Sequence, residues 1–227
     1  MTRIRLLTLN ALMRGDVRAR LRALGAILQE SDHDVVCLQE ILHAGGVRLL
    51  RRLTPRYGHY FATGFPLLHV GLMLLSRWPL VRPGFTRYRM AGPPRTEMLM
   101  RKGVQVAVVD TPGGELAVVN THLSANRDGD WSPGNRYARI TGAELDALAG
   151  LVAALDPALP AVVAGDFNVP RDSPAFTRFA ATAGLRDVLA GDTAPTYRPT
   201  ARFPTPPAID QVLIRSTSDR QLTATAR

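Results

Sequence analysis

Four short apolar runs that stop abruptly on polar side chains constrain the fold of this chain most strongly. They are LLTLN, ending at Asn10; VVCLQE, ending at Glu40; AVVNTH, ending at His122; and AVVAGDFN, ending at Asp166 and Asn168. Apolar runs of this length are typical of strands that are buried on both faces. A fifth strand pattern begins on an acid, Asp210. We therefore predict a layered α+β protein in which at least one sheet is covered on both sides.

Helical and strand patterns alternate along the rest of the chain. Apolar steps of three and four residues predict helices that start after Asp16 and Asn135 and that cover Gly46–Leu53 and Ala175–Ala183. Strands are expected at Arg3–Ala11, Asp34–Leu38, His59–Thr63, Gly71–Leu75, Gln105–Asp110, Glu115–Asn120 and Ile209–Ile214. The Pro-rich stretch 190–208 is expected to be a long loop. No repeat, linker or change of composition divides residues 1–227, so we expect a single domain.

The bulk composition excludes several classes of protein. No apolar run approaches the ~20 residues that span a bilayer, and the N-terminus lacks a signal-peptide cleavage site, so we expect no membrane insertion. Cys37 is the only cysteine, which excludes an internal disulfide and fits the reducing cytoplasm, and its place within VVCLQ predicts a buried apolar residue. We also expect a monomer. The net charge of +9 comes almost wholly from arginine. It suits an anionic substrate, although a general bias toward arginine explains the scattered charges as well.

The polar residues at the strand ends have the chemistry of a site for a hard cation. Neighbouring strand ends converge in space, and two or three carboxylates with amides supply the oxygen ligands that Mg²⁺ prefers. Only one histidine and no cysteine belong to the set, which disfavours structural zinc. Each residue also has a structural reading when taken alone. Asp166 suits a turn, Glu40 a helix N-terminus, and His122 a half-buried histidine that has its hydrogen bonds satisfied.

The order of these motifs resembles one known family. Asn10, Gln39-Glu40, the stretch Gly71–Pro79, Thr121-His122-Leu123, Gly165-Asp-Phe-Asn168 and Ile209-Asp210 are similar to the motifs of the endonuclease/exonuclease/phosphatase superfamily. This superfamily includes deoxyribonuclease I, abasic-site endonucleases, inositol polyphosphate 5-phosphatases and neutral sphingomyelinases. The resemblance runs from Thr8 to about Ile214, which is nearly the whole chain.

The resemblance implies a four-layer α/β/β/α sandwich of two mixed sheets and a metal-dependent hydrolase of phosphoester bonds. Water would attack the phosphorus in line, with Mg²⁺ as cofactor and Mn²⁺ as a substitute. By position, Glu40 corresponds to the metal ligand, with Asn10 beside it and Asp210 near the metal and the leaving group. Asp166 corresponds to the residue that orients or deprotonates water. Asn168 and His122 correspond to groups that hydrogen-bond the phosphoryl oxygens. Alternation along the strand predicts that Asp166 and Asn168 point the same way.

The chain departs from the family pattern at its C-terminal end. The pattern closes with Ser-Asp-His and an apolar strand, whereas all five histidines of this sequence precede the GDFN stretch. Ser218-Asp219-Arg220 is similar only in part, because an arginine that stays protonated stands in place of the histidine. We expect a C-terminally truncated member that lacks one strand and one catalytic group. Such a chain would be a poor catalyst, and a non-catalytic member is the alternative.

The substrate stays open at this point. The loop Ser124–Asn135 contains Trp131, which suits either stacking on a ring or packing on the core. The stretch Arg82–Arg101 interleaves arginines with Phe85 and Tyr88, which suits either a phosphate-rich ligand or a solvated rim. We therefore expect a phosphate-ester substrate, with nucleic acid as one option for a phosphodiesterase or nuclease-like enzyme. A phosphomonoesterase that acts on a small metabolite or a lipid headgroup is the third reading.

Overall fold

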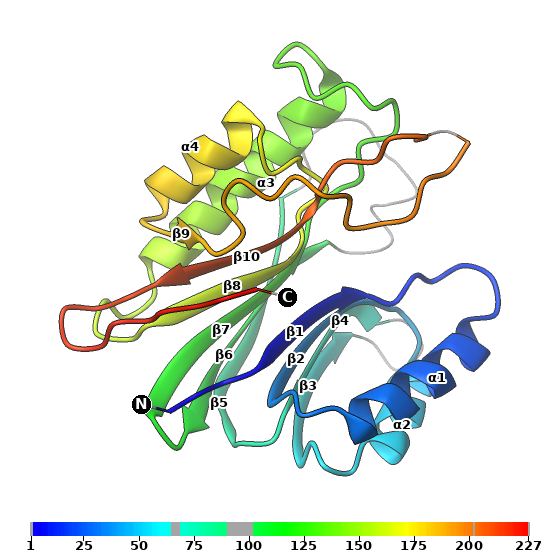
Figure 1. Cartoon of the computed structure of the whole chain (residues 1–227), viewed down its shortest axis with the longest axis vertical. Coiled ribbons are helices and arrows are strands. Elements are labelled where there is room, and N and C mark those ends of the chain that lie inside the picture. Colours follow the sequence, from blue (N-terminus) through cyan, green and yellow to red (C-terminus); the bar gives the residue numbers. More distant parts are fainter. Residues whose placement is uncertain (1, 65–68, 90–101, 202, 227) are drawn as a thin grey trace.

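The protein is described here by a computed structural model, which covers residues 2–64, 69–89, 102–201 and 203–226. Within these residues two β-sheets face each other, and helices cover the outer side of each sheet (Figure 1). Both sheets contain parallel and antiparallel pairs. The predicted four-layer sandwich of two mixed sheets is therefore confirmed, while the missing C-terminal strand stays a prediction.

The first sheet has four strands in the order β1-β2-β4-β3. Its strands are β1 (Leu6–Asn10), β2 (Val35–Ile41), β3 (His59–Gly64) and β4 (His69–Ser76). The helices α1 (Val17–Glu30) and α2 (Ala44–Leu53) cover its outer face (Figure 1). As predicted, α1 starts directly after Asp16, whose Oδ1 accepts a hydrogen bond from the Ala19 amide at 3.0 Å. Because β1 and β2 run parallel, with Asn10 opposite Gln39, their carboxyl ends lie at the same edge.

The second sheet has six strands in the order β5-β6-β7-β8-β10-β9. Its strands are β5 (Leu80–Arg87), β6 (Gly103–Thr111), β7 (Gly114–His122), β8 (Ala161–Asp166), β9 (Arg186–Asp187) and β10 (Asp210–Arg215). The helices α3 (Arg136–Ala153) and α4 (Pro174–Thr182) cover its outer face (Figure 1). The parallel pair β7–β8 ends at His122 and Asp166, and the antiparallel strand β10 starts opposite that end, at Asp210.

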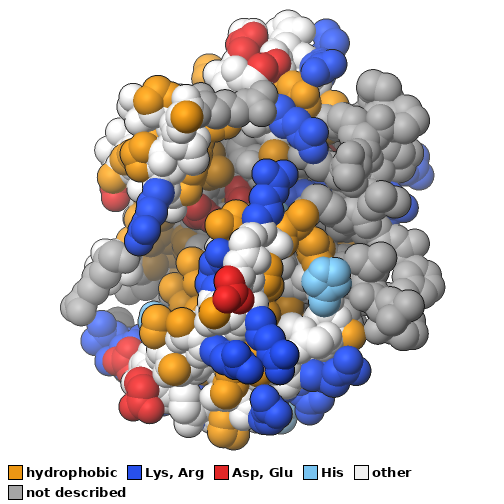
Figure 2. Space-filling view, turned by 90° about the vertical axis from the view of Figure 1, so that its right-hand side faces the viewer, with side chains coloured by type: hydrophobic (Ala, Val, Ile, Leu, Met, Phe, Trp, Pro, Cys, Tyr) orange, Lys and Arg blue, Asp and Glu red, His pale blue; other side chains and the backbone are white. Residues whose placement is uncertain are grey.

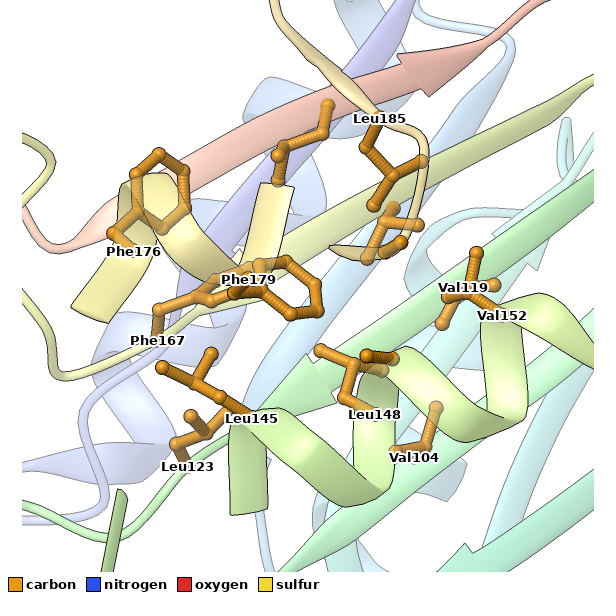
Figure 3. Close-up of a cluster of buried hydrophobic side chains, with 14 of the residues drawn as sticks. Val104, Val119, Leu123, Leu145, Leu148, Val152, Phe167, Phe176, Phe179 and Leu185 are labelled. Carbon is orange, nitrogen blue, oxygen red and sulfur yellow. The ribbon is translucent and has the colours of Figure 1, made fainter. Parts of the chain in front are cut away.

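Apolar side chains fill the three spaces between the four layers. Beneath α3 and α4, three buried phenylalanines pack together, with Phe167 edge-on to Phe176 at a ring distance of 5.8 Å (Figure 3). A second cluster joins α1 and α2 to the first sheet, and a third fills the space between the sheets. Cys37 belongs to this third cluster and is fully buried, as its apolar neighbours in the sequence predict.

Three details of the strands differ from the prediction. β5 and the short β9 were not expected; most of β5 is solvent-exposed at a sheet edge, so it carries no apolar run. β2 was expected to end at Leu38 but continues to Ile41: the register of its pairing with β4 shifts at a β-bulge between Leu38 and Ile41, and pairing resumes at Ile41 opposite Gly71. The bulge therefore contains Glu40, and bulges of this kind re-aim a side chain next to a site.

Candidate active site

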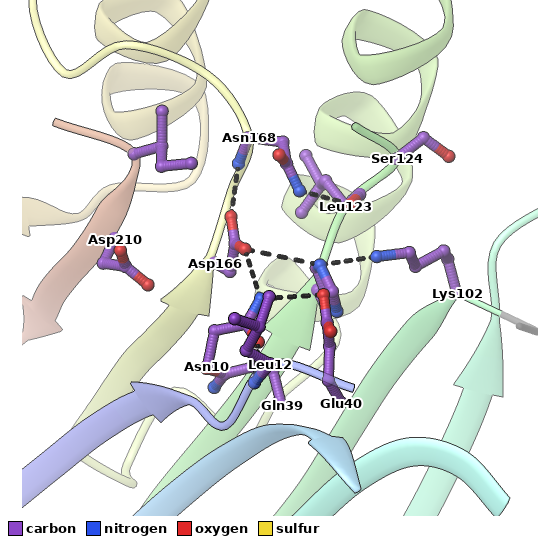
Figure 4. A network of polar contacts seen from close by, with 12 residues as sticks. Asn10, Leu12, Gln39, Glu40, Lys102, Leu123, Ser124, Asp166, Asn168 and Asp210 are labelled. Carbon is purple, nitrogen blue, oxygen red and sulfur yellow. Dashed lines mark hydrogen bonds and ion pairs between the residues drawn. The ribbon is translucent and has the colours of Figure 1, made fainter. Parts of the chain in front are cut away.

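All of the strand-end residues singled out in the sequence meet at one edge of the two sheets (Figure 4). Asn10 and Glu40 come from the first sheet, and the remaining four come from the second: His122, Asp166, Asn168 and Asp210. Side chains from both sheets thus lie together at this edge. Their convergence matches the prediction, whereas the chemical role of each residue stays a prediction.

The amide of Asn10 joins the two sheets at the centre of the site. Its Nδ2 donates to Glu40 Oε1 at 3.1 Å and to Asp166 Oδ2 at 2.9 Å, so the two carboxylate oxygens lie within about 6 Å of each other. The second oxygen of each carboxylate also has a fixed partner. The Met13 amide donates to Glu40 Oε2 at 2.7 Å, and the Asn168 amide donates to Asp166 Oδ1 at 3.0 Å. Both carboxylates are therefore held in one orientation.

A basic pair faces Asp166 from the second sheet. His122 Nε2 lies 3.4 Å from Asp166 Oδ2, and Lys102 Nζ contacts the same ring nitrogen at 2.5 Å (Figure 4). All three side chains are buried. When His122 Nε2 carries no proton, it can accept a hydrogen bond from the Lys102 ammonium. When Nε2 carries a proton, it can donate to Asp166 instead. Lys102 is the only lysine of the chain and was not predicted at the site.

The pKa values of the two aspartates shift in opposite directions. Burial alone would raise the pKa of Asp166, but the charge and hydrogen bond of His122, the charge of Lys102 and the Asn10 amide lower it below its usual value. Burial, followed by the negative charge of Asp166, raises the pKa of Asp210 to about 7. The two residues are directly paired across β8 and β10. Two nearby carboxylates in different environments are typical of functional sites.

Asp210 differs from the other acids in its contacts. Its Oδ1 is buried and has no hydrogen-bond partner among the described residues, and Figure 4 shows it beside Asp166 without a contact to the other residues drawn. Its backbone is held firmly, because the buried guanidinium of Arg171 donates to Asp210 O at 2.7 Å and to Gln211 Oε1 at 2.7 Å. Arg171 lies in the loop after GDFN, and no motif in the sequence pointed to it.

Backbone strain is concentrated at this edge. Among the described residues four non-glycine residues have a positive φ, and three of them lie here: Leu12 at 53°, Glu40 at 64° and Asn168 at 51°. Such conformations are unfavourable and persist where the surroundings over-determine them. The turn at Asn168 corrects one interpretation of the sequence. Regular alternation was expected to point Asp166 and Asn168 the same way, but β8 ends at Asp166, and Asn168 Nδ2 donates to Leu123 O at 2.9 Å.

A ladder of three buried amides lies directly beneath the site, between the two sheets. Gln39 Nε2 donates to Asn120 Oδ1 at 2.8 Å, and Asn120 Nδ2 donates to Gln105 Oε1 at 3.1 Å. The ladder also reaches the backbone of the first sheet, because Gln105 Nε2 donates to Leu72 O at 3.1 Å. All three amides are fully buried. Gln39 adjoins Glu40, and Asn120 lies two residues before His122, so the ladder connects the strands that present these two groups.

The oxygen donors at this edge fit a hard divalent cation. Glu40, Asp166 and Asp210 offer carboxylate oxygens, and Mg²⁺ usually takes one or two carboxylates and keeps several waters. The buried Oδ1 of Asp210, which has no partner in the described ranges, is an oxygen that a cation would satisfy. Among the described residues no group of three or more His, Cys, Asp or Glu side chains is arranged to hold a metal ion by itself.

Aromatic side chains border the site on the side of α3. Trp131 Nε1 donates to Asn168 O at 3.1 Å, so Trp131 braces the turn at the site. Burial, followed by the charge of Asp166, raises the pKa of Tyr197 in the long loop 190–208. Tyr197 also meets Phe203 edge-on at 6.5 Å. Of the predicted arginine stretch, residues 90–101 lie outside the described part.

Arg220 lies away from the site. Its guanidinium donates to the backbone of Gly113 at 2.8 Å and of Glu115, at the turn between β6 and β7. That turn is the end of the β6–β7 hairpin opposite His122. None of the helices in the described ranges is both long and apolar enough to cross a bilayer. The monomeric state and the cytoplasmic location stay predictions.

Comparison with known sequences identifies the family of this fold. The model of the endonuclease/exonuclease/phosphatase family matches residues 7–222. A curated relative, the inositol phosphosphingolipids phospholipase C of Schizosaccharomyces pombe, is 31% identical over 117 residues, which are 47% of this chain and 26% of that protein. The chain thus spans about a quarter of the length of this relative.

Comparison with solved structures gives the same fold. Sphingomyelinase C from Streptomyces griseocarneus has a TM-score of 0.77 at 20% identity, covering 97% of this chain and 86% of that one. A Staphylococcus aureus beta toxin mutant with bound magnesium ions has a TM-score of 0.74 at 16% identity, covering 99% and 87%. The D. rerio protein TDP2, complexed with single strand DNA product, has a TM-score of 0.70 at 16% identity, covering 96% and 84%. At these identities the likeness shows the fold alone.

Proposed function

Because this chain belongs to the endonuclease/exonuclease/phosphatase family, we propose that it is a metal-dependent hydrolase of phosphoester bonds and in particular a phosphodiesterase. The observation that carries the proposal is the array in which Asn10 holds the Glu40 and Asp166 carboxylates while His122 and Lys102 face Asp166. The names of the relatives support this class of substrate, because they include a phospholipase C and a sphingomyelinase C.

Asp166 is the proposed base for the attacking water. Its lowered pKa keeps the carboxylate ionised, and the Asn10 amide and the Asn168 backbone amide fix its plane. Oδ1 of Asp166, which accepts one hydrogen bond from the Asn168 amide, has a second lone pair that can accept a proton from water. A positioned general base contributes about 10²–10⁴-fold to a rate.

His122 and Lys102 are the proposed partners of the phosphoryl oxygens. Negative charge develops on these oxygens as water attacks, and fixed positive donors in a buried site stabilise it without reorganisation. Lys102 supplies the charge, and His122, in contact with both Lys102 and Asp166, lies between the cation and the base. Asn168 would add a polar contact from the neighbouring turn.

Glu40 is the proposed main metal ligand, with Asn10 beside it and Asp210 completing the donor set. A bound Mg²⁺ or Mn²⁺ would neutralise charge on the phosphoryl oxygens and activate water. Met13 N and Asn10 Nδ2 hold the Glu40 carboxylate in place. The Oδ1 of Asp210, which no described residue hydrogen-bonds, gives this residue an oxygen to contribute.

Hydrolysis of bis-p-nitrophenyl phosphate tests the proposal. We expect turnover with Mg²⁺ or Mn²⁺ that EDTA abolishes. Glu40→Gln should raise the half-saturating metal concentration by about tenfold or more, because a neutral amide binds a hard cation more weakly. Glu30→Gln is the matched control, since Glu30 is exposed at the end of α1.

Each other outcome has a defined meaning. Full activity in EDTA, or the same metal dependence for both variants, would remove Glu40 from the metal site. Turnover of p-nitrophenyl phosphate without turnover of the diester would replace the phosphodiesterase with a phosphomonoesterase. No turnover of either compound with either metal would favour a non-catalytic member of the family.

A further inference from the structure

The loop between β1 and α1 exposes apolar side chains at the edge of the candidate active site. Leu12 is 50% exposed, and the neighbouring Leu9 at the end of β1 is 38% exposed. Only four large hydrophobic side chains are exposed among the described residues, and these are two of them. Leu12 also holds a positive φ of 53°. The chain thus keeps an apolar side chain in solvent through an unfavourable backbone conformation.

Hydrogen bonds hold this loop in place from both sides. The Leu12 amide donates to Asn10 Oδ1 at 2.9 Å, and the Met13 amide donates to Glu40 Oε2 at 2.7 Å. On the other side, Arg20 Nη1 donates to Leu12 O at 2.6 Å and to Arg14 O at 3.0 Å. The loop is therefore preformed, and two side chains of the candidate active site fix where Leu12 projects.

Exposed arginines continue from this loop onto the two neighbouring helices. α1 and α2 together carry six arginines and one carboxylate, Glu30. Leu21 faces Gly46 and Gly25 faces Leu53, so the helices run in the same direction and begin at the same edge. Lys and Arg side chains gather in the lower part of Figure 2, where Figure 1 places these helices.

Four residues at this edge form what we call the docking rim: Leu12, Arg14, Arg18 and Arg48. Arg18 and Arg48 lie within the first five residues of α1 and α2. The side chains of all three arginines are exposed and make no hydrogen bond or ion pair with any residue that the structure describes. Unengaged guanidinium groups are suited to phosphate oxygens.

We propose that the docking rim binds the surface of an anionic lipid bilayer, with Leu12 entering the headgroup layer and the three arginines contacting lipid phosphates. Docking of this kind combines apolar insertion with electrostatic attraction. Because the loop also contacts Asn10 and Glu40, the bound surface would face the candidate active site. That orientation toward a lipid substrate rests on the proposed function, whereas the binding itself does not.

The composition of the rim favours lipid over nucleic acid. Proteins that bind single strands place aromatic rings beside their basic side chains, because bases stack on them. In the docking rim the side chain beside the arginines is Leu12, which is aliphatic. An exposed leucine gains from leaving water for the acyl boundary but offers no ring for stacking.

Vesicle co-sedimentation in EDTA tests the proposal without requiring turnover. We expect binding to phosphatidylcholine–phosphatidylserine vesicles, weak binding to phosphatidylcholine alone, and weakening by salt. Each basic residue near an anionic surface strengthens binding about fivefold, so R14Q/R18Q/R48Q should weaken it about a hundredfold. Leu12→Asn should weaken it about fivefold, and asparagine tolerates the positive φ.

Two control variants separate the rim from general charge and hydrophobicity. R3Q/R139Q/R178Q removes the same charge from exposed arginines outside the rim and outside α1 and α2, and Ile27→Asn removes an apolar side chain that is 64% exposed near the far end of α1. Both should bind vesicles within about twofold of the unchanged chain. Equal losses in rim and control variants, or no vesicle binding, would overturn the proposal, as would binding of single-stranded DNA but not vesicles through the rim arginines. Vesicle binding without diester hydrolysis would count against the proposed function alone.

Discussion

Replacing Gly165 by alanine should destabilise the protein and disturb the candidate active site together. Gly165 has a φ of 149°, and a Cβ at this position would lie 2.0 Å from the backbone oxygen of Thr121. Thr121 is its direct partner in the parallel β7–β8 pair, one residue before His122 and Asp166. Overpacking destabilises by ~1–3 kcal/mol and a backbone conformation reserved for glycine by a similar amount. We therefore expect a loss of about 3–5 kcal/mol, out of a total stability of ~5–15 kcal/mol.

Thermal unfolding followed by circular dichroism measures this loss. A change of that size should lower the melting temperature by about 10 °C for a chain of this length. Gly150→Ala is the control, because a Cβ at Gly150, inside α3, meets nothing within 4 Å. Alanine there should stabilise by ~0.5–1 kcal/mol. If Gly165→Ala melts within about 2 °C of the unchanged chain, the close approach of β7 and β8 is not a constraint, and the argument is wrong.

Three further predictions concern buried polar groups. Burial raises the pKa of Cys37 from 9.0 to about 12, so the native thiol should resist a disulfide reagent near neutral pH and react only after unfolding. The pKa of the Cys37 thiol is higher in the folded state than in the unfolded state, so the contribution of this thiol to stability is complete below about pH 9 and declines as the pH rises further. Unfolding measured at several pH values tests this. Tyr88→Phe removes a buried contact of 2.7 Å to Thr121 Oγ1 and should lower the free energy of unfolding by about 1–2 kcal/mol in urea; an unchanged midpoint would contradict this. Arg171→Met should cost about 3–5 kcal/mol, since Asp187 and Gln211 lose a buried partner, and Arg171→Lys should recover part of that loss in the same assay; equal melting of all three chains would exclude the bracing role.

The sequence predicted the fold well where local pattern and burial agree. Buried strands such as β8 read as apolar runs, and the caps at Asp16 and Asn135 mark the starts of α1 and α3. β5 was not predicted from the sequence, because its side chains are mostly exposed and it contains Pro83. An edge strand pairs with one neighbouring strand, and its sequence therefore need not contain the apolar run by which a buried strand is recognised.

The candidate site was predictable to the extent that its residues stand at strand ends. Lys102 could not be found in this way, because only the pairing of Gly103 with His122 across β6 and β7 brings it to the site. Arg171 likewise acts on β10 through a loop contact with residues about 40 positions later. The orientation of Glu40 depends on a bulge, and that of Asn168 on a turn, which alternation along a strand does not describe.

The buried amide ladder beneath the site has a consequence for how this protein can change during evolution. Gln39, Asn120 and Gln105 come from three strands in two sheets, and the side-chain oxygens of Asn120 and Gln105 each accept a hydrogen bond from the preceding amide of the ladder. Replacing Gln39 or Asn120 alone by an apolar residue would remove the donor to the oxygen of the next amide, whereas joint replacement could restore an apolar interface. The three positions should therefore mutate as a group, so that relatives keep all three amides or none.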